Sequence, residues 1–117
     1  MIGLDRLMEI KGVVAAGQFS EDGKIIRKVG ELPGDMLTSA ELCVRQNDKS
    51  RQLLKALDAR SERDWQPLVG WVVWGSHYSV VVVGNTRVFV ETGHVDYNQL
   101  MIDLVGSEAT GPRPYNY

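Results

Sequence analysis

Cysteine is almost missing from this sequence, which has one, Cys43, among its 117 residues. A single cysteine excludes an intrachain disulfide and any zinc site built on several thiolates. The sequence also has almost no excess of charge of one sign, because the formal net charge is −2. No basic surplus therefore points to nucleic acid or anionic lipid as a partner. No segment approaches the roughly 18 consecutive apolar residues that a membrane span requires, and the charged residues between Asp5 and Lys11 interrupt the N-terminal segment where a secretory signal would be apolar. We expect a cytoplasmic protein without a nucleic-acid or membrane partner.

Motifs for catalysis and for phosphate binding are missing as well. The glycines form neither a GxGxxG nor a P-loop pattern. The segment 84–86, Gly-Asn-Thr, lies between two predicted strands and is typical of a hairpin turn. His77 and His94 lack the further ligands that a metal site needs, and no base is evident near Cys43, whose apolar helix face predicts a small core residue. We expect no catalytic residue, no metal and no cofactor.

What the sequence does contain is the pattern of a globular domain, with 44% hydrophobic and 24% charged residues. Hydrophobic periodicity and turn residues predict, in chain order, a helix at 4–10, strands at 13–19 and 24–29, a long helix ending near Leu57, strands at 68–74, 78–83 and 87–91, and a helix capped by Asp96. The strand 24–29 carries three cations, which suit an exposed sheet edge. The long helix begins at Asp35 or at a capping box formed by Thr38 and Glu41.

The three later strands are joined by segments too short for crossovers, so they form an antiparallel meander. Residues 68–74 and 80–83 are apolar without alternation, which indicates that both faces of the sheet are covered. We therefore predict an α+β fold, a helix-sheet-helix sandwich around one five-stranded antiparallel sheet with the order α-β-β-α-β-β-β-α. The domain is expected to span 1–106, and the Gly- and Pro-rich segment 107–117 to be a flexible tail.

The long helix carries two apolar stripes. Its main face is formed by Met36, Ala40, Cys43, Val44, Leu54 and Leu57. A second stripe, Leu42, Gln46 and Leu53, flanks the polar face. Asn47 lies within the main face, either as a core amide bonded to the backbone or as a register residue at a helix-helix contact.

Several short stretches resemble a prokaryotic group of uncharacterised roadblock-like proteins, within the profilin-like and longin-like folds. They are EIKGVVAAGQF at 9–19, DGK at 22–24, Gly70-Trp71, Tyr78-Ser79-Val80 and GNTRVFVET at 84–92. Together they extend from about residue 4 to residue 105. None of them is a catalytic signature, so the resemblance concerns a scaffold.

The resemblance implies a dimer, because roadblock domains pair with their long helices side by side and their sheets continued across the interface. It also implies a scaffold or regulator for a Ras-like small GTPase or for a multi-protein assembly. An apolar strand at 68–74 would be an aggregation hazard at a sheet edge unless a second chain paired with it. The candidate homodimer interface is Leu42, Gln46, Leu53, Trp71 and Trp74, with Asn47 as a possible register residue.

The leading expectation is thus a non-catalytic homodimer that binds a protein partner, either a small GTPase or an enzyme complex. The alternative is a small-molecule sensor with its ligand between sheet and helix, over Ala15, Ala16 and Gly17, where side chains are small. Filling of that space by Phe19, Trp71 or Leu104 would remove the alternative. An enzyme of another class is the third and weakest hypothesis, because no nucleophile and base can be paired.

Overall fold

A computed structural model of the chain describes residues 4–20, 24–31 and 40–108. Its elements follow in the predicted order: α1 (Leu4–Leu7), β1 (Val13–Phe19), β2 (Ile25–Gly30), α2 (Ala40–Arg60), β3 (Gly70–Trp74), β4 (Tyr78–Val83), β5 (Thr86–Glu91) and α3 (Tyr97–Glu108). The predicted α+β fold is confirmed. The proposed caps of the long helix, Asp35 and Thr38, and its apolar residue Met36 lie outside the described residues, as does 109–117 of the predicted tail.

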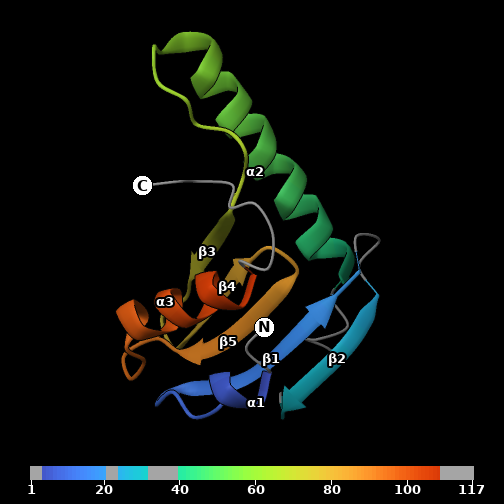
Figure 1. Cartoon of the computed structure of the whole chain (residues 1–117), viewed down its shortest axis with the longest axis vertical. Coiled ribbons are helices and arrows are strands. Elements are labelled where there is room, and N and C mark those ends of the chain that lie inside the picture. The colour runs from blue at the N-terminus through green and yellow to red at the C-terminus, as the bar shows by residue number, and fades with distance from the viewer. Residues whose placement is uncertain (1–3, 21–23, 32–39, 109–117) are drawn as a thin grey trace.

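The five strands form one antiparallel sheet in the order β2-β1-β5-β4-β3. In this described sheet β2 and β3 are the edge strands, and β5 lies at the centre (Figure 1). The prediction of an edge strand at 24–29 is therefore confirmed for β2. The predicted strand 68–74 lies at the other edge as β3, but it starts two residues later than predicted, at Gly70. A glycine is required there, because an added Cβ would lie 2.1 Å from the carbonyl oxygen of Val82.

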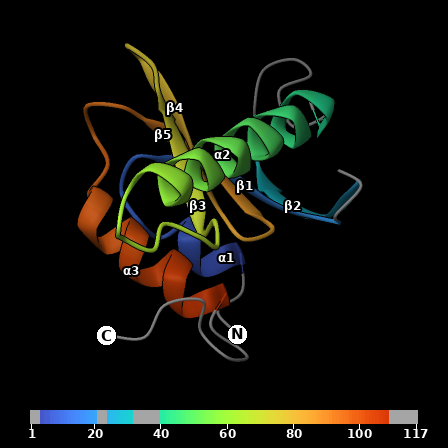
Figure 2. The same ribbon diagram turned by 90° about the horizontal axis from the view of Figure 1, so that it is seen from above.

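Helices α1 and α3 cover one face of the sheet (Figure 2). Four leucines from these helices pack against alternate side chains of the central strands: Leu4, Leu7, Leu100 and Leu104 on Ala16, Val81, Val83, Val88 and Val90. Helix α3 begins where the sequence predicted, because the Asp96 Oδ1 atom accepts the backbone N–H of Gln99 at 3.1 Å. The first helix is shorter than predicted: it ends at Leu7, and tighter turns follow before Gly12, whose φ is +89°.

Helix α2 crosses the opposite face of the sheet and extends well beyond it (Figures 1 and 2). Beneath it, Ala15, Phe19 and Phe89 form a second, smaller core. Among the described side chains of α2, residues 42–60, none is fully buried. The expected main apolar face is thus only half-buried on the sheet, and this layer is much less complete than the one formed by α1 and α3.

Candidate interaction surface beside the edge strand

The edge strand β3 leaves apolar side chains exposed on both faces of the sheet. Val73 faces α2 and is 49% exposed, and Trp74, on the other face, is 75% exposed. Within the described sheet β3 has one neighbour, β4, so its other side presents backbone groups ready to pair with another strand. An apolar strand of this kind fits an interface better than a solvated edge.

A shallow apolar groove of about 280 Å³ lies between α2 and the β3 side of the sheet. Its walls are formed by Leu42, Cys43 and Gln46 of α2, Trp71 and Val73 of β3, and Val80 and Phe89. The structure therefore brings together three of the residues that the sequence placed at a dimer interface, Leu42, Gln46 and Trp71. Leu42 is 63% exposed at the rim of this groove.

Two other candidate interface residues lie outside the groove. Leu53 continues the exposed stripe of α2 toward the C-terminal half of the helix, and it is 60% exposed. Trp74 lies on the opposite face of the sheet, where its ring is 5.9 Å from that of Tyr97 in α3. The period of two along a strand explains this, because residues three apart point to opposite faces.

Asn47 is held by a side chain and not by the backbone. Its Oδ1 atom accepts a hydrogen bond from the indole Nε1–H of Trp71, and both residues are half-buried. The expected satisfied amide is thus present, but the expected backbone partner was wrong. This bond ties the middle of α2 to the edge strand, and a role of Asn47 in setting the register of a dimer stays a prediction.

Cys43 was expected in the core, and the structure corrects this: the residue is half-buried in the wall of the groove. The helix face on which it lies does not pack fully on the sheet. Burial nevertheless raises the pKa of the thiol from its ordinary value, and the positive charge of Arg87 opposes that shift. The protonated thiol is a poor nucleophile.

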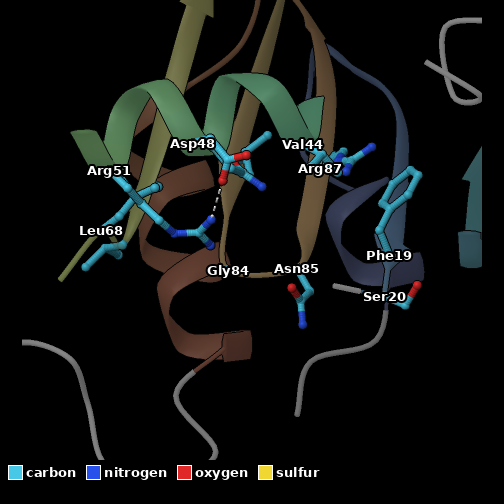
Figure 3. Close-up of a pocket in the computed structure, with 13 residues that line it drawn as sticks. Phe19, Ser20, Val44, Asp48, Arg51, Leu68, Gly84, Asn85 and Arg87 are labelled. Atoms are coloured by element: carbon cyan, nitrogen blue, oxygen red, sulfur yellow. Dashed lines mark hydrogen bonds and ion pairs between the residues drawn. The ribbon is translucent and has the colours of Figure 1, made fainter. Parts of the chain in front are cut away.

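A second cavity, of about 410 Å³, lies on the other flank of α2 and is more polar (Figure 3). It is bounded by α2, by the end of β1, by the β4–β5 turn and by the start of β3. Phe19 and Arg87 lie together at one end, and an ion pair of 3.3 Å between Asp48 and Arg51 lies at the other. Sequence reasoning missed Arg87, although a cation directly before the apolar run Val88-Phe89-Val90 was a usable signal.

The space over Ala15, Ala16 and Gly17, where a ligand was the alternative hypothesis, is filled. Both alanines are fully buried, and the Phe19 ring lies 2.9 Å from the position of a Cβ on Gly17. Filling by Phe19 removes this location for a ligand. A ligand between sheet and helix would need the cavity beside Arg87 instead.

The histidines lie apart, with His77 Nδ1 2.9 Å from Ser76 Oγ and His94 Nε2 4.0 Å from Glu91. In the described part of the chain, no three His, Cys, Asp or Glu side chains gather as a metal site would require. No helix of 4–20, 24–31 and 40–108 is both long enough and apolar enough to cross a bilayer.

Comparisons with known proteins agree with the fold. The family model described as "Uncharacterized conserved protein (DUF2173)" matches residues 3–105. A roadblock/LC7 domain from Streptomyces avermitilis superposes with a TM-score of 0.66 at 20% identity, over 89% of each chain. The gliding protein mglB from Thermus thermophilus gives 0.68 at 16% identity, over 91% of this chain and 78% of that one. No curated protein matches significantly. The likeness establishes the roadblock fold, and the resemblance found in the sequence is confirmed.

Proposed function

We propose that this chain, which belongs to the family described as Uncharacterized conserved protein (DUF2173), is a non-catalytic homodimer that binds a protein partner. The observation that carries the proposal is the apolar edge strand β3 beside the unburied stripe of α2. Neither surface is completed within the described chain, and both lie on the same side of the domain. One symmetric partner would complete both.

In the proposed dimer, β3 pairs antiparallel with β3 of a second copy, so that the two sheets become one. A two-fold axis across this edge places the same patch of each copy against its equivalent. The two α2 helices then lie side by side over the extended sheet and cover Leu42, Gln46 and Leu53. Trp71 is buried beneath them, while Trp74 lies across the junction on the other face of the sheet.

The partner we propose is a Ras-like small GTPase or a multi-protein enzyme complex in the cytoplasm. Support comes from the resemblance to roadblock domains, which implies a scaffold or regulator for such partners. The fold shared with a roadblock/LC7 domain is consistent with that role. A continuous sheet with paired helices offers a broad, rigid platform, as protein recognition requires. Residues 1–106 would form that platform together with Ser107 and Glu108, because α3 continues two residues into the segment that the sequence predicted to be a tail.

Sedimentation of the full chain at micromolar concentration tests the dimer. A two-fold mass with a concentration-dependent dissociation is expected, whereas a chain that stays monomeric would refute the proposal. The partner is tested by capture from the host with the dimer as bait, followed by reconstitution with purified small GTPase loaded with GDP or with GTP. Binding of neither form, together with capture of no enzyme complex, would contradict a scaffold role while leaving the dimer intact.

A further inference from the structure

Arg87 is a buried cation without a counterion in the part of the chain that the structure describes. It lies on the central strand β5, facing α2, and only 4% of its surface is exposed. Its guanidinium carbon lies 3.7 Å from the centre of the Phe19 ring. Neither a carboxylate nor a hydrogen-bond acceptor among the described residues contacts the guanidinium.

The guanidinium nitrogens still reach open space. Among the described residues, no fully enclosed side-chain nitrogen or oxygen lacks a hydrogen-bond partner. Because Arg87 has no such partner, its nitrogens must open onto the cavity that its side chain lines. The cation is thus presented to the cavity and screened from bulk solvent.

Such an arrangement is costly unless an anion completes it. Burial lowers the pKa of the Arg87 guanidinium, which expresses the energy of holding a charge away from water. The Cys43 thiol is near enough to interact, but its own raised pKa keeps it neutral and unable to serve as the counterion. Stacking on Phe19 compensates only part of the lost hydration.

The remaining walls indicate which anion fits. The second arginine of the cavity, Arg51, is already paired with Asp48, so one positive charge is left unmatched. The Asp48–Arg51 pair is net neutral, so it supplies no second cation for a doubly charged group such as a phosphate monoester. Phe19, Val44 and Val82 supply apolar surface, and the exposed Asn85 lies at the mouth of the cavity.

We propose that this cavity between α2 and the β4–β5 turn binds a small organic monocarboxylate, whose carboxylate pairs with Arg87. A guanidinium fork matches the two oxygens of a carboxylate. The volume of about 410 Å³ lies near the lower end of the range for small-molecule pockets, roughly 300–1,000 Å³, and suits a compact ligand. The site shares no lining residue with the groove on the other flank of α2, so it goes beyond the proposed dimer and does not depend on it.

The test is a nuclear magnetic resonance titration of the full chain with butanoate, using butanamide as the uncharged equivalent and butyl phosphate as the doubly charged one. Butanoate at millimolar concentration is expected to shift the Arg87 Nε–H and Asn85 amide resonances, and butanamide to leave them unchanged. Arg87→Met is expected to weaken butanoate binding at least ~10-fold, the scale of one charge-assisted hydrogen bond. The matched control, Arg27→Met on the exposed strand β2, is expected to bind as the wild type does.

Several outcomes would overturn the assignment. These are no shift with butanoate, equal shifts with butanamide, tighter binding of butyl phosphate, and unchanged binding by Arg87→Met. An acetylated dipeptide with a free C-terminal carboxylate that binds where butanoate does not would assign the site to a protein terminus and overturn the small ligand. Should Arg87→Met fail to fold, the three-ligand titration of the wild type decides by itself.

Discussion

Replacing Leu42 and Leu53 by glutamate is the most direct perturbation of the proposed dimer. The two side chains are 63% and 60% exposed in the single chain, so most of their surface is still available for burial. Complete burial of a leucine is worth about 1.5–3 kcal/mol, which leaves about 0.9–1.9 kcal/mol to be gained at each site. Two leucines from each of two copies then contribute roughly 4–7 kcal/mol to association.

Loss of about 4 kcal/mol corresponds to about a thousandfold increase in the Kd of the dimer. Charge repulsion between the introduced carboxylates adds to this effect. Folding of the single chain should change little, because glutamate is a good helix former and the replaced side chains are already mostly exposed. The double variant is therefore expected to be a folded monomer at concentrations where the wild type is a dimer.

Sedimentation equilibrium measures the Kd, and far-ultraviolet circular dichroism reports whether α2 remains helical. Ile102→Glu is the matched control: Ile102 is 66% exposed on α3, so the change in charge and in apolar surface is the same at a site outside the proposed interface. The reasoning is refuted if the double variant dimerises as the wild type does. It is equally refuted if the Ile102 control dissociates the dimer to the same degree.

Three further predictions concern other contacts. Trp71→Phe removes the indole donor to Asn47 and should destabilise the fold by about 1 kcal/mol in urea unfolding; a stability equal to wild type would show that this bond contributes nothing. Because burial raises its pKa, Cys43 of the wild type should be alkylated by iodoacetamide at pH 8 more slowly than a free thiol, and a rate equal to that of free cysteine contradicts this. In the double glutamate variant no second copy covers the groove that Cys43 lines, so alkylation should be faster than in the wild type. Hydrogen bonds from the Gln66 side chain and from the backbone N–H of Trp65 lower the pKa of Asp58. The loop after α2 therefore keeps these contacts above the ordinary carboxylate pKa of about 3.9 and loses them as pH falls through the lowered pKa of the folded state. A carboxyl resonance of Asp58 that titrates at the ordinary pKa would disprove this prediction.

Much of the fold followed from local patterns. The helix cap at Asp96, the meander and the cationic edge strand were all predicted, because each depends on residues close together in the chain. The positions of Trp71 and Trp74 on opposite faces also follow from strand period, although they had been grouped in one interface. Cys43 was misplaced because an apolar helix face shows only that burial is favourable, and not whether the helix packs closely enough on the sheet beneath to provide it. Here an open groove separates Cys43 from β3, β4 and β5.

The sequence by itself determined the kinds of elements, their order and the surplus of apolar surface, since these depend on composition and on periods of two and 3.6 residues. Only the tertiary structure decided that β5 is central and β3 is an edge, because strand order depends on how long connections cross the sheet. The tertiary structure also decided how closely α2 packs on the sheet, and none of its side chains among residues 42–60 is fully buried. The packing of α2 on the sheet places Arg87 beneath that helix, beside a cavity and beyond the reach of any carboxylate in the described chain. A lone arginine in a strand is visible in the sequence, but its lack of a counterion is a property of the segments that pack around it.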